Sequence, residues 1–261
     1  MSVVLSFDAQ AAAWIEATYA TPDVTATRAA AFRAANIRAG EQVLDVGCGP
    51  GFFLRDLAIA VGSEGRAVGI DISEPMLALA KARCADLSNV EFERTVAAHL
   101  PASDGRVDLV CGLQTYAYLE DLEVGLAELH RVLRPGGRAV ILDTDFSGLV
   151  WKSRDRDRMR RILEAYNRHV AWPDLPRVLP HCLGRSGFEV TRCEALPIVA
   201  LSYHPNTLAY GVACIIHRFV TESAGVSVGD ADAWLAEFDV LERERAFFFA
   251  LNRFLFVARR Q

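Results

Sequence analysis

Short apolar runs alternate with amphipathic helical segments along the chain up to about residue 145. A continuous apolar run is typical of a strand buried on both faces, whereas apolar residues that recur every three or four positions indicate a helix with one buried face. Strands that alternate with helices of about a dozen residues imply right-handed crossovers and a mostly parallel sheet covered on both faces. The expected strands are Gln42–Val46, Ala67–Ile72, Val90–Glu93, Val107–Cys111 and Arg138–Asp143, and the expected helices between them are Phe52–Ala58, Met76–Ala85 and Leu122–Leu133.

The alternation changes after Thr144, where helical patterns become more frequent. A basic pattern over Trp151–His169 places arginines among Asp155 and Asp157, and we expect a solvated helix face with ion pairs rather than an anion-binding surface. The chain closes on Phe247–Ala258, which is too apolar for an exposed edge and is expected to be a strand inside the sheet. Further helices are expected at Phe7–Tyr19, Val24–Ile37, Leu175–Arg185, Thr207–Val220 and Asp230–Glu244, and a sixth strand at Phe188–Cys193.

The turn after the first expected strand carries three glycines, Gly47, Gly49 and Gly51, at alternate positions. Glycines there let the backbone turn sharply and approach a ligand closely, and the helix that follows presents unpaired N–H groups. Asp71 ends the second expected strand, where a carboxylate can accept hydrogen bonds from a ribose diol. The unit therefore predicts a site for an adenosine-containing cofactor.

The glycine spacing separates this site from a dinucleotide site. Dinucleotide sites carry the pattern G-x-G-x-x-G, whereas the spacing here is Gly47-x-Gly49-x-Gly51. A carboxylate at Asp45, two residues before the first glycine, suits a ligand with an ammonium group and would repel a pyrophosphate. S-adenosylmethionine has an ammonium group, a ribose diol and an adenine and needs no phosphate cradle, so it is the predicted cofactor.

Taken together, motifs in the order found between about residues 40 and 145 resemble the class I S-adenosylmethionine-dependent methyltransferases, in particular the small-molecule group around the ubiquinone and menaquinone biosynthesis methyltransferases. The motifs are Val43–Gly51, Gly69–Met76, Leu100–Pro101 with Val107–Val110, and Leu133–Gly137. The resemblance implies an α/β, Rossmann-like seven-stranded sheet of order 3-2-1-4-5-7-6 whose last strand is antiparallel, with helices on both faces and a helical cap. It also implies methyl transfer to an oxygen, nitrogen or carbon of a small metabolite, with S-adenosylhomocysteine as the product.

Carried over position by position, the resemblance assigns cofactor roles within these motifs. It places the glycine turn on the methionine part of the cofactor, Asp45 near its ammonium group and Asp71 on the ribose hydroxyls. The chain departs from the family at Val96, four positions before the Leu-Pro pair, where an acid usually receives the adenine amino group. The expected cofactor contacts are Asp45, Gly47, Cys48, Gly49, Gly51, Asp71, Ile72, Met76, Val96, Ala97 and Gln114.

Residues that would meet the acceptor are expected after the fourth and fifth strands and on the late helical insertions. These positions lie near the carboxyl ends of strands, where open α/β sheets bind ligands. His204 and His169 are the candidate general bases because imidazole titrates near neutrality, although a lone histidine is more often structural. The expected acceptor contacts are Tyr116, Asp145, Trp151 and Tyr203.

We expect a single domain over residues 1–261. Its parts would be a helical cap at 1–38, a cofactor-binding core at 40–145, and helical insertions at 146–187 and 198–246 that form a lid over the acceptor. The aromatic and apolar content of the insertions favours an aromatic or otherwise apolar small acceptor.

Composition and charge narrow the class of protein. The chain has 52% hydrophobic and 23% charged residues, which allows a sizeable core. Its net charge of −5 argues against a general nucleic-acid binder, because neutralising phosphates needs a surplus of Lys and Arg. Six cysteines without a CxxC pair or metal-ligand spacing look like reduced thiols, and no run of about 18 apolar residues suggests a membrane span. We therefore expect a cytoplasmic enzyme with a small-molecule acceptor and without metal, nucleic acid or membrane partner, and dimerisation through the N-terminal helices stays open.

Two alternatives stand beside a small-molecule methyltransferase. Arsenite methylation would require several cysteines to converge near the sulfonium, yet only Cys48 belongs to the glycine turn. A cofactor-binding protein without catalysis, such as a regulator or an assembly partner, is consistent with the departure at Val96. An NAD-dependent dehydrogenase is disfavoured by the glycine spacing.

Overall fold

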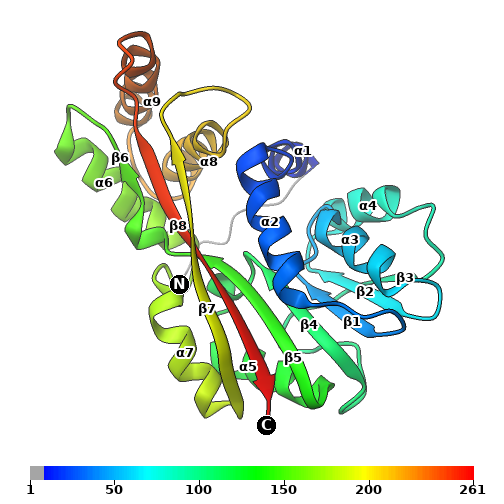
Figure 1. The fold of residues 1–261 in the computed structure, drawn as a ribbon. Coiled ribbons are helices and arrows are strands. Elements are labelled where there is room, and N and C mark those ends of the chain that lie inside the picture. Colours follow the sequence, from blue (N-terminus) through cyan, green and yellow to red (C-terminus); the bar gives the residue numbers. More distant parts are fainter. Residues whose placement is uncertain (1–8) are drawn as a thin grey trace.

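One mixed β-sheet organises the fold (Figure 1). The structure, a computed structural model, describes residues 9–261, with side chains from residue 14 onward. Parallel strands lie in the order β3-β2-β1-β4-β5. Antiparallel β8 pairs with β7 along one edge, and along the opposite edge it pairs with β5 and, further on, with the short β6. The strands are β1 Gln42–Val46, β2 Arg66–Asp71, β3 Val90–Arg94, β4 Val107–Leu113, β5 Leu133–Thr144, β6 Val150–Trp151, β7 Phe188–Ala200 and β8 Phe249–Arg260.

Helices cover both faces of the sheet, as its buried strands require. Successive residues of β1 point to opposite faces, so Val43 packs with Leu54 of α3 in one core while Leu44 packs with Leu126 of α5 in another. The helices are α1 Ala9–Tyr19, α2 Pro22–Ala35, α3 Phe52–Val61, α4 Glu74–Arg83, α5 Leu122–Val132, α6 Arg156–Tyr166, α7 Leu175–Arg185, α8 Leu208–Glu222 and α9 Val228–Arg243.

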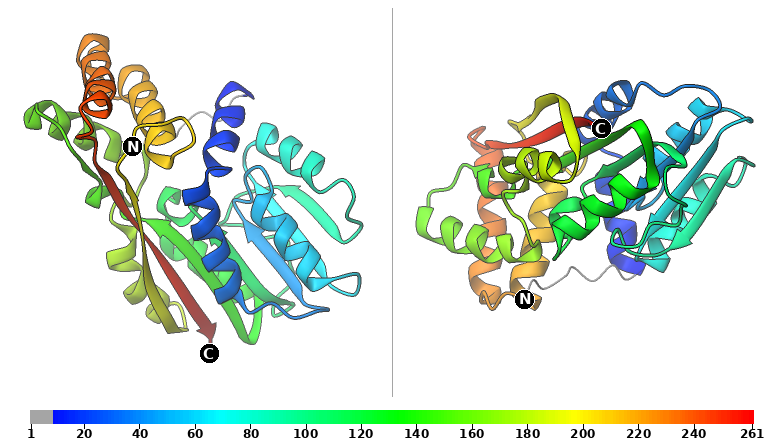
Figure 2. Two further views of the ribbon diagram at one scale, coloured as in Figure 1. Left: turned by 45° about the horizontal axis from the view of Figure 1, so that its top comes forward. Right: turned by 90° about the horizontal axis from the view of Figure 1, so that it is seen from below.

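A third core lies where β7 and β8 extend beyond β5 as a long antiparallel pair (Figures 1 and 2). Helices α6, α8 and α9 pack together at the extended end of these strands. Helix α8 also packs against α1, which lies near the start of the chain. Aromatic rings fill this core: Trp151 of β6 stacks on Phe238 of α9 with centroids 4.8 Å apart and also contacts Trp234 and Phe249. The third core therefore fixes α8 above the carboxyl ends of the parallel strands.

The predicted strand order is confirmed. The C-terminal apolar run forms β8, which lies antiparallel between β5 and the strand that begins at Phe188. An eighth strand, β6, was not predicted, and it shortens the expected basic helix because Trp151 belongs to β6. Helix α6 begins at Arg156 because Asp155 caps it, accepting a hydrogen bond from the Arg158 amide at 2.9 Å.

The basic face of α6 carries the predicted ion pairs. Arg158 pairs with its cap residue Asp155 at 3.4 Å, and Arg160 pairs with Asp157 at 3.1 Å and with Glu164 at 3.9 Å. The first two residues of the helix expected at Phe7–Tyr19 lie outside the described residues, and the described part forms α1.

Candidate functional site

A cavity of about 490 Å³ lies at the carboxyl ends of the parallel strands. Val46, Asp71 and Leu113, near the ends of β1, β2 and β4, form part of its wall, which is the edge where open α/β sheets bind ligands. A smaller cavity of about 50 Å³ adjoins it, and the wall of this smaller cavity contains Asp45 and Cys48. The other expected cofactor contacts on the wall of the large cavity are Gly47, Gly49, Ile72, Met76, Val96, Ala97 and Gln114.

Glycine is required in the turn after β1 because the backbone there has positive φ angles and because two of the three positions leave no room for a Cβ. Gly47 has φ +69°, and a Cβ at this position would lie 2.3 Å from Oγ1 of Thr115. Gly49 has φ +52°, and a Cβ there would meet only Tyr19, at 4.0 Å. Gly51 lies on neither cavity wall, since it packs against Ala80 of α4. The turn is therefore tightly packed from behind and open towards the cavity in front of Gly49.

Asp71 ties the glycine turn to the second strand. Its Oδ2 accepts a hydrogen bond from the Gly49 amide at 2.9 Å, and its Oδ1 accepts one from the Ser73 amide at 2.8 Å. Burial raises the pKa of Asp71, and the bonds from Ser73 and Gly49 oppose that rise. Each carboxylate oxygen retains a further lone pair, so Asp71 can accept bonds from ligand hydroxyls while holding the turn.

Asp45 is a buried carboxyl group with one oxygen that no described residue satisfies. Its side chain is 1% exposed, and Oδ2 has no hydrogen-bond partner among the described residues. Burial, followed by the charges of Asp71 and Asp56, raises the pKa of Asp45 to about 8. A positive group placed in the smaller cavity would stabilise the ionised form, so Asp45 fits a ligand ammonium group.

The raised pKa of Asp45 predicts how the stability of the ligand-free protein depends on pH. An aspartate titrates near pH 3.9 in an unfolded chain, so at higher pH the folded state holds a proton that the unfolded state has lost. The resulting stabilisation is fully present below about pH 4 and is lost as pH rises to the folded pKa of about 8. We expect the Tm of the wild type to fall more steeply from about pH 5 to about pH 8 than that of Asp45→Asn, as measured by calorimetry. Each 1 kcal/mol corresponds to about 2–4 °C, and equal pH slopes would contradict the assignment.

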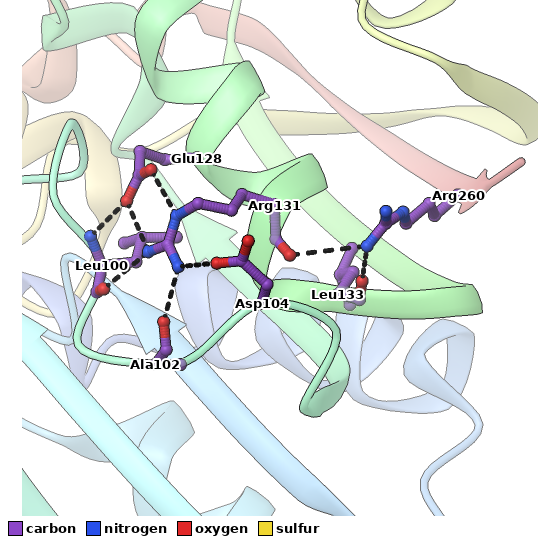
Figure 3. A network of polar contacts seen from close by, with 7 residues as sticks. All are labelled: Leu100, Ala102, Asp104, Glu128, Arg131, Leu133 and Arg260. Atoms are coloured by element: carbon purple, nitrogen blue, oxygen red, sulfur yellow. Dashed lines mark hydrogen bonds and ion pairs between the residues drawn. The ribbon is translucent and has the colours of Figure 1, made fainter.

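A polar network centred on Arg131 of α5 anchors the loop that follows β3 (Figure 3). Its guanidinium donates to the carbonyl oxygens of Leu100 at 3.1 Å and Ala102 at 2.8 Å, while Glu128 accepts a bond from the Leu100 amide at 2.8 Å. The same loop brings Val96 and Ala97 to the cavity wall. The network therefore positions the loop so that Val96 and Ala97 face the cavity, and neither residue has an acidic side chain.

The rest of the large cavity is an apolar chamber beyond the glycine turn. We define the apolar chamber by residues of α1, α8, β8 and the loops after β4 and β5. Its two helical walls belong to parts of the chain about two hundred residues apart, since α1 packs against α8. The defining residues are Ile15, Tyr118, Phe146, Leu149, Val212 and Leu251.

The four expected acceptor contacts lie outside the walls of these two cavities, and Trp151 instead lines a separate cavity beside α6. Tyr116 is fully buried beneath the large cavity, and Asp145 forms an ion pair with Arg177 at 2.9 Å. Trp151 and Tyr203 belong to the aromatic core between α9 and the far end of β8. Tyr116 and Asp145 follow β4 and β5 as expected, whereas Trp151 lies in β6 and not in a helix. The direction of each side chain depends on packing that sequence position does not specify.

Neither histidine expected as a base lies on the cavity wall. His204 is exposed before α8, where Nδ1 accepts a bond from the Asn206 amide at 3.1 Å. His169 is 1% exposed, and its Nδ1 lies 2.6 Å from the Tyr166 carbonyl oxygen, which assigns the proton to Nδ1. Burial lowers the pKa of His169 to about 4, and its ring stacks on that of Tyr166, which does lie on the wall. The two imidazoles are thus held in structural positions.

Two residues that line both cavities, Arg253 and Tyr19, were not predicted. Arg253 is the only charged residue in the apolar run Phe247–Ala258. A single charge in a strand predicted to be buried could have indicated a functional residue. Tyr19 carried no comparable signal, because an aromatic residue near a helix end is common.

Residues 9–261 contain neither a membrane-spanning helix nor a metal-binding cluster. No helix in this range has the length and apolar character needed to cross a membrane. No group of three or more His, Cys, Asp or Glu side chains in the same range could hold a metal ion. The cysteines are free thiols, of which Cys48, Cys84 and Cys111 are buried.

Residues 43–137 match a family model described as "Methyltransferase domain". Among curated proteins, the chain is 41% identical over 137 residues to an uncharacterized 37.1 kDa protein in transposon TN4556 of Streptomyces fradiae, covering 52% of this chain and 39% of that protein. It is 39% identical over 112 residues to a demethylmenaquinone methyltransferase of Staphylococcus epidermidis, covering 42% of this chain and 45% of that protein. The matches thus span less than half the length of these two relatives.

A solved structure similar over nearly the whole chain is that of phosphoethanolamine N-methyltransferase 2 from Haemonchus contortus, in complex with phosphomonomethylethanolamine and S-adenosylhomocysteine. The TM-score is 0.63 at 16% identity, over 97% of this chain and 58% of that one. At this identity the likeness concerns the fold alone, and the predicted Rossmann-like sheet with its antiparallel strand is confirmed.

Proposed function

We propose that the protein transfers a methyl group from S-adenosylmethionine to an oxygen, nitrogen or carbon atom of a small apolar or aromatic metabolite, because residues 43–137 match a methyltransferase domain and the sheet has the predicted strand order. Support comes from the family match and from the two cavities at the carboxyl edge of the sheet. The solved relative from Haemonchus contortus that contains S-adenosylhomocysteine has the same fold.

The observation that carries the proposal is the orphaned Asp45 carboxyl group beside an open glycine turn. Asp45 Oδ2 is buried without a partner, and a Cβ at Gly49 would have open space in front of it. The cavity that contains Asp45 shares Gly47, Leu113 and Gln114 with the larger cavity, so one elongated ligand can reach from the turn to the chamber. The residues present therefore fit the proposed cofactor.

Each residue of the site has a binding role in this proposal. Asp45 would bind the ammonium group and Asp71 the ribose hydroxyls, while Ile72 and Met76 would flank the adenine. S-adenosylmethionine, when bound, supplies a methyl group that is already activated on a sulfonium. The protein's contribution is then to align the acceptor with that group and to exclude water.

The apolar chamber gives the acceptor its place and its character. Its walls at Ile15, Val212 and Leu251 would bind an apolar body, and α1 and α8 would act as the lid that keeps water out. In the insertion at 146–187, Phe146, Leu149 and Tyr166 reach the cavity, whereas α7 packs on the sheet with α5, β5 and β7. The lid therefore consists of α1 and α8 in this proposal.

The polar groups of the chamber are suited to donate hydrogen bonds. Burial raises the pKa values of Tyr118 and Tyr166, so both phenols stay protonated near neutral pH. They would orient a polar atom of the acceptor, and the described wall includes no histidine that could remove its proton. The proposal therefore favours an acceptor atom that is nucleophilic without a histidine base.

Isothermal titration calorimetry with S-adenosylmethionine and S-adenosylhomocysteine tests the proposal. We expect both ligands to bind with one site per chain, and NAD to show no heat of binding. A panel of small phenols, amines and carboxylic acids, assayed for S-adenosylhomocysteine release, then tests transfer. Failure of the wild type to bind either sulfur ligand would rule the proposed function out.

Two other functions receive less support. Arsenite methylation needs converging thiols, but only Cys48 lies on a cavity wall, while Cys84 and Cys111 are buried elsewhere. A non-catalytic binding protein would have little need for an apolar chamber that adjoins the proposed cofactor site. Binding of S-adenosylmethionine without turnover of any panel compound would favour a non-catalytic binding protein.

A further inference from the structure

Arg253 is a buried cation that has no carboxylate partner among the described side chains. Its side chain is 4% exposed, and its guanidinium donates one hydrogen bond, from Nη1 to Oγ1 of Thr27 at 3.0 Å. Its Nε has no partner among the described residues. Burying a charge in this way is unfavourable unless an opposite charge compensates it. An unpaired arginine on a cavity wall therefore indicates a place for an anionic group.

The acidic groups that act on Arg253 do not pair with it directly. Burial lowers the pKa of Arg253, and the charges of Tyr19, Asp143 and Asp23 oppose that effect. Oδ2 of Asp143 instead accepts bonds from the amides of Tyr116 at 3.0 Å and Ala117 at 3.4 Å. Within residues 14–261, no carboxylate lies within ion-pair distance of Arg253.

Arg253 and Asp45 lie on the wall of the same small cavity and do not pair with each other. The wall of this cavity thus includes one residue with an unsatisfied carboxyl oxygen and one with an unsatisfied guanidinium nitrogen, together with Gly47 and Gln114. An α-amino acid group carries the two complementary charges, an ammonium and a carboxylate, close together. The pair of buried groups matches that arrangement.

The second arginine of this cavity is already engaged. Arg28 donates to the carbonyl oxygen of Tyr19 at 3.1 Å and to Oγ1 of Thr25 at 3.3 Å, and it lies 3.8 Å from Asp56. Its guanidinium also lies over the ring of Phe52, with the carbon 4.8 Å from the centroid. Arg253 is the cation with unused donors.

We propose that Arg253, from the inserted C-terminal strand, binds the α-carboxylate of the cofactor's methionine part and forms an amino-acid receptor together with Asp45. The inference rests on the proposed function, because it assigns an additional contact at the same cofactor site. With this contact, β8 would contribute to both the cofactor site and the apolar chamber. Leu251 lies two residues from Arg253 on the same face of the strand and lines the apolar chamber.

The test measures ligand affinity by calorimetry for the wild type and Arg253→Met. The ligands are S-adenosylhomocysteine and its decarboxylated analogue, which keeps the ammonium group and the nucleoside. We expect Arg253→Met to weaken S-adenosylhomocysteine binding roughly 10- to 100-fold, the usual range for a lost hydrogen bond to a charged group. We expect the affinity for the analogue to change by less than about threefold, because the analogue has no carboxylate for Arg253 to bind.

A matched control and a conservative variant keep the test decisive. Arg259→Met removes an exposed arginine from the same strand and should leave both affinities unchanged. Arg253→Lys keeps the charge and should show an intermediate loss for S-adenosylhomocysteine; it replaces Arg253→Met in the test if that variant does not fold. Equal losses for both ligands, or unchanged S-adenosylhomocysteine affinity, would overturn the proposal and assign Arg253 a structural role. Failure of the wild type to bind either ligand would instead reject the proposed function itself.

Discussion

Asp71→Ala is expected to lower the affinity for S-adenosylhomocysteine by roughly 100-fold, since it removes charge-assisted hydrogen bonds worth about 1.5–3 kcal/mol each. The carboxylate has two tasks, because it holds the Gly49 and Ser73 amides at 2.9 and 2.8 Å and would also accept the ribose hydroxyls. Without it, the turn loses its connection to the second strand as well as its contact with the ligand. Calorimetric titration of the purified variant measures the loss.

Two further variants separate the tasks of Asp71. Asp71→Asn retains one acceptor oxygen, but its amide nitrogen cannot accept a bond from a backbone N–H, so an intermediate affinity is expected. Asp86→Ala removes an exposed acid that pairs with Arg55 at 2.5 Å and should leave binding unchanged. If Asp71→Ala bound S-adenosylhomocysteine within about threefold of the wild type, the ribose assignment would be incorrect.

Gly47→Ala is expected to lower the free energy of unfolding by roughly 2–5 kcal/mol and to abolish cofactor binding. The backbone has φ +69° at this glycine, and an added Cβ would lie 2.3 Å from Oγ1 of Thr115. That hydroxyl donates to the Val46 carbonyl oxygen at 2.9 Å, so moving it breaks a link between the turn and the fourth strand. Urea denaturation measures the change in stability, and calorimetry measures binding.

Gly40→Ala is the matched control for this substitution. Gly40 has φ +83°, but a Cβ there would meet no atom within 4 Å, so only the backbone strain of about 1–2 kcal/mol should appear. The difference between the two variants isolates the cost of the clash with Thr115. Similar losses in both would show that conformation alone, and not close packing, requires glycine after β1.

The sequence alone predicted which residues form the proposed cofactor half of the site. Asp45, the glycine turn and Asp71 belong to one strand-turn-helix-strand unit, and the pairing of β1 with β2 places both acids at one edge of the sheet. Hydrophobic periodicity predicted β1, β4 and β5 because most of their residues are buried, whereas the edge strand β3 alternates half-buried and exposed residues over Val90–Glu93. The role of Gly51, which packs against Ala80 rather than facing a cavity, was not predictable from the same pattern.

Tertiary structure alone determined which residues form the proposed acceptor half. The chamber joins α1 to α8, and Arg253 reaches Thr27 across 226 residues of sequence, because β8 inserts between β5 and β7. Such contacts depend on how distant apolar faces are buried against each other, and no local pattern specifies where the side chains then point. The sequence therefore predicted the glycine turn and, from that turn, the methyl donor. The tertiary fold determines which residues would line the acceptor's cavity. Arg253 lies on the cavity wall, whereas Tyr116 and His169 are buried away from it.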